Sequence, residues 1–192
     1  LVRTGSGMRF VVVCLVLGLV HLGIANEIPG GFMTQYTHPG VALTHLRNDD
    51  PVLRRQGIDL VANRLDFTIT PAVEKAVMKA LADPDEGVAA RATFVSGILD
   101  LKAAVEPIGR LAVEKPALTF TSLISLGQLD TPESRQLAKR LVKEPAVQEE
   151  PQALALMLGL LKVPLVDQLV SIYKAHPDDE DTRVAAIWSL GE

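Results

Sequence analysis

Segments of closely similar sequence return along the chain at nearly regular intervals. They read NRLD at 63–66, GILD at 97–100 and GQLD at 127–130. The residue that opens each segment has counterparts further on, and the almost evenly spaced series is Asn63, Gly97, Gly127, Gly159 and Gly191. Glycine and asparagine adopt the left-handed conformation that closes a helix. We therefore predict that each position caps a helix and that a turn to a second helix follows.

Prolines and capping residues mark where these helices begin. The first turn of a helix does not need the N–H that proline lacks, so proline is favoured there. The prolines that precede or open a first helix are Pro51, Pro84, Pro116 and Pro151, and those that open a second helix are Pro71, Pro132 and Pro164. The predicted N-caps are Asp50, Thr70 and Thr131.

Apolar residues between these signals follow helical spacing. One such stripe occupies positions i, i+3, i+4, i+7 and i+8 and consists of Val73, Ala76, Val77, Ala80 and Leu81. Aromatic residues make up only 4% of the chain, so the core must be aliphatic, as is typical of packed helices. A single helical hairpin cannot bury its stripe alone, and hairpins of this period stack on one another. The predicted fold is an all-α solenoid of stacked antiparallel hairpins, with about nine or ten short helices over residues 41–192 and no sheet.

Two stretches of the chain resemble HEAT repeats of the short bacterial kind. They are residues 83–114 and 178–192. In that family an acidic turn containing proline leads into a first helix rich in alanine and arginine. Arg55 and Arg183 match the arginine of the family, eight residues before the closing Asn or Gly. The other units depart from the pattern at that position, where they carry Ala89, Thr119 and Pro151. The resemblance implies about 4.5 HEAT-like repeats in residues 41–192, the last one incomplete, with residues 41–48 as a degenerate helix that caps the stack.

Residues 1–25 have the layout of a secretory signal peptide. Arg3 and Arg9 precede an uncharged apolar run at 10–20, and Gly23 and Ala25 are the small residues before a cleavage site. The apolar part spans about 11–15 residues, which is shorter than the roughly 20 that cross a bilayer as a stable helix. We predict cleavage after Ala25, a flexible leader at 26–40, and secretion or delivery to the periplasm. An uncleaved membrane anchor and a buried helix are the alternatives.

The single cysteine and the net charge limit the kinds of reactive site and ligand that the chain could have. Cys14 lies inside the apolar run, so a processed chain would have no thiol for a disulfide, a nucleophile or a metal site. Beyond residue 25 the chain carries 17 basic and 23 acidic residues, a net charge of −6. An acidic chain argues against binding to nucleic acid. If Met8 is the true start, residues 1–7 are upstream of the protein and the signal is more compact.

No group of residues in the sequence forms a convincing reactive site. The histidines are His21, His38, His45 and His176, and His45, which lies in the predicted capping helix, has no second ligand at helical spacing. The turn HPDDED at 176–181 could hold a hard cation, but its acids also suit a solvated turn that favours the N-terminus of the next helix. The GSG at 5–7 follows no strand, and serine, histidine and aspartate occur in no catalytic motif. We therefore predict no catalytic, cofactor-binding or metal-binding residue.

Basic pairs and the one tryptophan also have ordinary interpretations. The pairs Arg54–Arg55 and Lys139–Arg140 are predicted to lie on solvated helix faces rather than in phosphate sites. Trp188 is predicted to pack in the core on one face with Val184 and Ile187.

Two classes of function remain open. The first is a non-catalytic scaffold that binds a protein or peptide partner on the solenoid surface, because function in such folds lies in an extended surface. The second is an enzyme on the same scaffold. The resemblance includes di-iron hydroxylases, bilin lyases and DNA-repair glycosylases, but the chain has no His-Glu pair and is acidic. A third interpretation, an accessory N-terminal segment of a larger exported enzyme, is compatible with the first.

The last unit of the sequence stops at Gly191, where every earlier unit turns into its second helix. We expect the chain to be the beginning of a longer protein. Val184, Ile187 and Trp188 would then lack part of the surface that covers their counterparts, and the isolated chain would fray or self-associate through this uncapped repeat.

Overall fold

Helix boundaries in the structure follow the prolines of the sequence. The structure, a computed structural model, describes residues 39–62 and 70–192. The helices that begin at a proline are α2 (Pro39–Leu46), α3 (Pro51–Ala62), α4 (Pro71–Ala80), α7 (Pro116–Leu129), α8 (Pro132–Leu141), α9 (Pro145–Gln148) and α10 (Pro151–Leu160). The others are α5 (Glu86–Ile98), the 3-10 helix η1 (Lys102–Ala104), α6 (Val105–Glu114), α11 (Val166–Ala175) and α12 (Glu180–Gly191). Pro84 and Pro164 lie just before α5 and α11.

Helices make up 79% of the described residues, and none of these residues forms a strand, which confirms the all-α prediction. The described residues form eleven α-helices rather than nine or ten. One of them is the short helix α9, a single turn that begins at Pro145.

The predicted N-caps are confirmed by hydrogen bonds. The hydroxyl of Thr70 accepts from the backbone N–H of Val73 at 3.3 Å. At the start of α8, the Thr131 hydroxyl accepts from the N–H of Ser134 at 3.0 Å, and the Ser134 hydroxyl accepts from the N–H of Thr131 at 2.8 Å. The carboxylate of Asp50 accepts from the N–H of Val52 at 2.8 Å. Each cap satisfies a donor that the first helical turn leaves without a partner.

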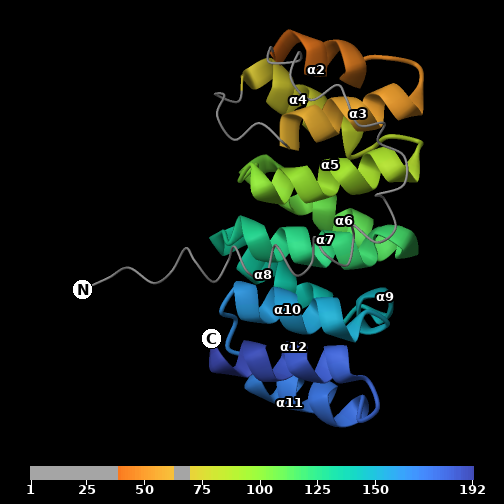
Figure 1. Cartoon of the computed structure of the whole chain (residues 1–192). Coiled ribbons are helices and arrows are strands. Elements are labelled where there is room, and N and C mark those ends of the chain that lie inside the picture. Colours follow the sequence, from red (N-terminus) through yellow and green to blue (C-terminus); the bar gives the residue numbers. More distant parts are fainter. Residues whose placement is uncertain (1–38, 63–69) are drawn as a thin grey trace. The chain divides into compact units, whose positions relative to one another are not determined.

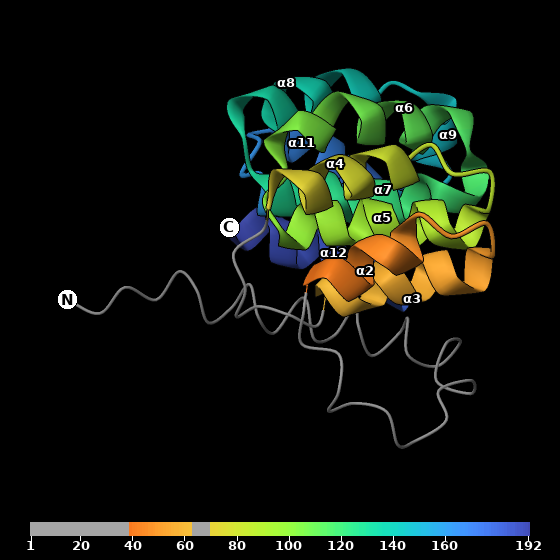
Figure 2. The ribbon, with the colours of Figure 1, turned by 90° about the horizontal axis from the view of Figure 1, so that it is seen from above.

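The described residues belong to one compact unit, in which the helices lie in two layers (Figures 1 and 2). Layer A holds α3, α5, α7, α10 and α12, and each of these helices packs on the next one in that order. Layer B holds α4, α6, α8 and α11, which pack against layer A, with α6 also in contact with α8. Helix α2 packs on both α3 and α4. Helices that follow each other in layer A are therefore separated in sequence by a helix of layer B.

The side chains between the layers are aliphatic, as the low aromatic content predicts. Four of the five residues in the predicted α4 stripe are buried, and Ala76 is partly exposed. The largest fully buried side chains are Ile58, Ile108, Leu118, Leu123, Leu126, Leu154, Met157, Leu158, Leu161, Val61, Val73 and Val77.

The predicted capping role of the repeated glycines is wrong. Gly97, Gly127 and Gly159 are buried inside α5, α7 and α10. The left-handed residues come three positions later and are Asp100 (φ 53°), Asp130 (φ 41°) and Lys162 (φ 52°). A short polar aspartate tolerates this conformation better than most residues with a side chain. The turn lies where the sequence predicts it, but the last residue of the repeated segment makes it, and not the first.

The glycines have a different role, which is to let neighbouring helices of layer A approach each other. A Cβ added at Gly97 would lie 3.1 Å from the backbone Cα of Ser125, and one at Gly127 would lie 3.0 Å from the Cβ of Leu160. A Cβ at Gly159 would lie 2.9 Å from the Cα of Ser189. Contacts this short are rare or absent at real Cβ atoms, so a side chain there would push the helices apart. Asn63, the first position of the series, lies outside the described residues.

The predicted signal peptide at 1–25 and residues 26–38 of the leader lie outside the described residues, together with Cys14, His21 and His38. Among the helices that the structure describes, none is both long enough and apolar enough to cross a membrane.

Candidate functional site

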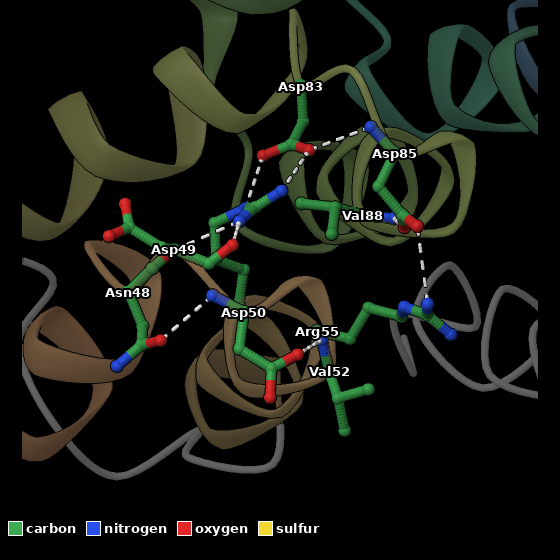
Figure 3. Close-up of polar contacts among 9 residues, drawn as sticks. Asn48, Asp49, Asp50, Val52, Arg55, Asp83, Asp85 and Val88 are labelled. Carbon is green, nitrogen blue, oxygen red and sulfur yellow. Dashed lines mark hydrogen bonds and ion pairs between the residues drawn. The ribbon is translucent and has the colours of Figure 1, made fainter.

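The densest polar cluster lies where α2, α3 and the turn before α5 meet (Figure 3). The guanidinium of Arg54, in the first turn of α3, donates from Nε and Nη2 to the two carboxylate oxygens of Asp83 at 2.7 and 2.8 Å. Its Nη1 donates to the carbonyl oxygens of Asn48 at 3.1 Å and Asp49 at 2.7 Å. Arg54 thus joins the α2–α3 turn to the α4–α5 turn, and its side chain is only 15% exposed.

The pKa shifts of Asp83 and Arg54 both favour the charged forms, which attract each other. Burial alone would raise the pKa of Asp83, but the hydrogen bonds from Arg54 and from the N–H of Asp85, with the charges of Arg54 and Lys79, lower that pKa overall. The same hydrogen bond to Asp83 raises the pKa of Arg54. Both groups are therefore charged at neutral pH, and all three nitrogens of the guanidinium donate within the protein.

Two further arginine–aspartate pairs join α3 to α5. Arg55 Nη2 lies 3.2 Å from Oδ2 of Asp85, whose other carboxylate oxygen caps α5 by accepting from the N–H of Val88 at 2.9 Å. Arg91 Nε lies 3.2 Å from Oδ1 of Asp59. Burial raises the pKa of Asp59, and the charge and hydrogen bond of Arg91 oppose that rise only in part.

The cluster is a structural junction rather than a binding site, because its arginines pair with aspartates in the turn before α5. The prediction of a solvated face is wrong for Arg54, whose side chain is mostly buried. Asp83 follows Arg54, and Asp85 follows Arg55, by close to one repeat period. That spacing is the signal in the sequence that could have identified the pairs.

The opposite end of layer A has a different surface. The face of α12 that points away from α10 carries the large aliphatic residues Val184, Ile187 and Leu190, which are 58%, 56% and 42% exposed. Nothing lies within 4 Å of the position that a Cβ at Gly191 would take. We call Arg183, Val184, Ile187, Leu190 and Gly191 the α12 outer face. Among residues 39–62 and 70–192, no helix covers it.

A shallow hollow of 340 Å³ lies on this face. The hollow is lined by two of the exposed aliphatic residues together with charged residues of α12 and of the turn before it. The lining consists of Pro177, Asp178, Glu180, Arg183, Val184 and Ile187. Arg183 donates to the carbonyl oxygen of Pro177 at 3.2 Å and to the hydroxyl of Tyr173 at 2.7 Å, and it lies over the Tyr173 ring at 4.9 Å. The guanidinium is thereby held in place beside the aliphatic residues.

The acidic turn before α12 caps the N-terminus of that helix. Asp179 accepts from the N–H of Thr182 at 3.1 Å and from its hydroxyl at 2.6 Å, and these bonds lower the pKa of Asp179. Within the described residues, no three His, Cys, Asp or Glu side chains are placed to hold a metal ion. His176 follows α11, and His45 lies in α2, where its buried Nδ1 has no hydrogen-bond partner among the described residues.

The remaining residues singled out in the sequence are distributed over separate surfaces. Lys139 and Arg140 are exposed on α8, and Arg140 pairs with Glu106 of α6 at 2.8 Å. Trp188 is half-buried, whereas Val184 and Ile187 are exposed, so the predicted core face that joins all three is wrong. On a helix, residues 184 and 187 lie on the outer side, and the alanines at 185 and 186 are buried against the neighbouring helices.

The geometry thus leaves one surface in the described residues that combines exposed aliphatic side chains, a positioned arginine and a hollow. No protein-family profile matches the chain, and no curated protein matches it in sequence.

Proposed function

We propose that the chain is an exported, non-catalytic scaffold, built as a HEAT-like α-solenoid, that binds a protein or peptide partner on its surface. One observation carries the proposal, namely that the same close contact recurs at successive junctions of layer A. Gly97 meets Ser125, Gly127 meets Met157 and Leu160, and Gly159 meets Ser189. Stacked units of this kind present long continuous surfaces, and binding to such surfaces is their common use.

The polar residues support binding rather than chemistry. The strongest cluster, around Arg54 and Asp83, joins α3 to the turn before α5, and Asp179 caps α12. The exposed surface remains, and it includes an outer face of α12 with aliphatic side chains that water solvates poorly.

Photo-crosslinking in the native cell tests the binding function and locates the surface. A photoreactive residue replaces Gln136 on layer B, Gln56 on α3 or Val184 on α12, each of which is exposed. We expect one discrete crosslinked protein from at least one position and none from the others. A chain that forms no specific adduct from any of these surfaces would contradict the proposal.

Metal analysis of the purified protein tests the non-catalytic part. We expect less than stoichiometric iron, zinc or manganese. One bound ion per chain, or turnover of a substrate by the purified protein, would contradict this part of the proposal.

Export is tested separately by sequencing the N-terminus of the protein recovered from its native cell. We expect the mature chain to begin at Asn26 or close to it, outside the cytoplasm. An intact N-terminus in the cytoplasm would contradict export and leave the binding proposal standing.

A further inference from the structure

Helices α2 and α3 form a tightly packed pair. A Cβ added at Gly57 of α3 would lie 2.8 Å from the backbone nitrogen of Leu46 and 3.0 Å from the carbonyl oxygen of Ala42, both in α2. These are backbone atoms, which cannot move aside unless the whole helix moves. We therefore treat α2 and α3 as one body and call them the latch pair.

The contact between Arg54 and Asp83 joins two groups that are each oriented by their own segment (Figure 3). On the side of the latch pair, Arg54 donates to the carbonyl oxygens of Asn48 at 3.1 Å and Asp49 at 2.7 Å. On the other side, the N–H of Asp85 donates to the Asp83 carboxylate at 2.9 Å. Because both groups are held in position before they meet, the contact can break and form again at a low cost in conformational entropy.

The contact of Arg54 with Asp83 is better shielded from water than the other two ion pairs of this junction. Its side chains are 15% and 9% exposed, whereas the acid is 26% exposed in the Arg55 pair and 48% exposed in the Arg91 pair. Partly solvated ion pairs contribute little to stability, but a shielded charge that loses its partner is costly. The attachment of α3 to the turn before α5 therefore depends mainly on Arg54 and Asp83.

Helix α3 buries a smaller share of its residues than the helices in the middle of layer A. Three of its twelve residues are buried, and the large side chains among them are Ile58 and Val61. Seven of thirteen residues are buried in α5 and nine of fourteen in α7. Segments with few buried apolar side chains open at a lower free energy than the rest of a protein, so the latch pair is expected to open before the middle of the stack.

We propose that the latch pair opens from α4 and α5 as one unit, while α5 and the helices after it stay stacked, and that the contact between Arg54 and Asp83 holds it closed. Opening uncovers the side of α5 against which α3 packs, so the latch pair controls access to a surface inside layer A. This motion lies within the chain and does not depend on the proposed binding function.

Amide hydrogen exchange of the full chain, followed by NMR under native conditions, measures the opening of each helix. The amides compared are those of Leu46 in α2, Ile58 in α3, Leu123 in α7 and Leu158 in α10, all at buried positions. We expect the protection factors of Leu46 and Ile58 to agree within about threefold, because the two helices open together. We expect both to be at least about tenfold lower than those of Leu123 and Leu158.

Ile108→Val is the variant that separates the latch pair from the stack, since Ile108 is fully buried in α6. We expect the protection factors of Leu123 and Leu158 to fall at least about twofold. Those of Leu46 and Ile58 should not change, because α6 stays folded when the latch pair opens.

Asp83→Asn destabilises the closed state, from which both the opening of the latch pair and global unfolding start. We expect the protection factors of Leu46 and Ile58 to fall at least about tenfold, with a similar fall in the stack. Glu106→Gln is the matched control, because the pair of Glu106 with Arg140 also joins two units but is 61% and 64% exposed. It should change protection less than about twofold at every position.

Three outcomes would overturn the proposal. Equal loss of protection at all four positions in Ile108→Val would show that the chain opens as one unit. Fast exchange at Leu46 alone, with Ile58 as protected as the stack, would show that α2 frays without α3. A change of less than about twofold in Asp83→Asn would show that the contact with Arg54 does not hold the pair closed. If Asp83→Asn does not fold, the exchange of the parent chain and of Ile108→Val still decides whether the latch pair opens separately.

Discussion

The α3–α5 junction and the α10–α12 junction connect the same layer with different chemistry. Between α3 and α5, arginines of one unit reach aspartates of the next, as in the pair of Arg54 with Asp83. Between α10 and α12, Gly159 lets the helices approach until a serine hydroxyl reaches a backbone carbonyl of the neighbouring helix.

The difference shows that neighbouring helices of layer A can be held together by more than one type of contact. A charged junction depends on ionisation, so its strength changes with pH and salt. A glycine junction depends on shape, so it resists both but tolerates no added atom. We therefore expect substitutions to affect the two kinds of junction differently.

The largest effect is expected at the glycine junction. Gly159→Val would place side-chain atoms within 2.8 Å of the Cβ and 2.9 Å of the Cα of Ser189, so α12 must move away from α10. We expect a loss of about 3 kcal/mol in the free energy of unfolding, measured by chemical denaturation. Gly191→Val is the control, since nothing lies within 4 Å of its Cβ position, and it should cost less than about 1 kcal/mol. Equal losses in the two variants would show that the close contact at Gly159 is not the cause of the lost stability.

The next effect is expected at the charged junction. Asp83→Asn removes the carboxylate that holds the mostly buried Arg54, and we expect a loss of about 2 kcal/mol at pH 7. The folded protein lowers the pKa of Asp83, so its contribution is complete above the unfolded value of about 3.9 and is lost as the pH falls through the lowered folded value. The stability difference between parent and variant should therefore shrink in acid. A difference that stays constant down to about pH 2 would show that the carboxylate charge is not what matters.

A smaller effect is expected at a helix start, where neither junction is involved. Thr131→Ala removes the hydroxyl that accepts from the N–H of Ser134 and should cost about 1 kcal/mol, measured by thermal or chemical unfolding. Thr131→Ser keeps the hydroxyl and should retain most of that stability. If the serine variant loses as much as the alanine variant, the buried methyl group of Thr131 matters more than the cap.

The smallest effect, of opposite sign in its pH dependence, is expected at Asp59. Burial raises the pKa of Asp59 in the folded protein, so the parent gains stability as the pH falls from that raised value towards about 3.9. Asp59→Asn lacks this gain and should differ from the parent by less than about 0.5 kcal/mol at pH 7, because the Arg91 pair is partly exposed. Urea titrations at several pH values measure both trends. Parallel pH profiles for Asp59→Asn and Asp83→Asn would contradict the opposite pKa shifts of the two aspartates.

Much of the fold could be predicted because helix starts are local. A proline after Thr70 or Thr131 sets the backbone and the cap within a few residues, and the helices begin there. The candidate site could not be predicted in the same way. The sequence shows Val184 and Ile187 as apolar residues at helical spacing, but whether a neighbouring helix covers them depends on the packing of distant segments.

The sequence by itself determined the helical class and the starts of many helices, because proline, capping side chains and apolar spacing act within one or two turns. Only the tertiary structure decided what the repeated glycines do. Glycine is suited both to a left-handed turn and to a close contact between helices, so the sequence does not distinguish the two roles. The choice was made by the neighbouring helix one repeat further along the chain, which lies so close to Gly97, Gly127 and Gly159 that a side chain would push it away, while Asp100, Asp130 and Lys162 make the turns.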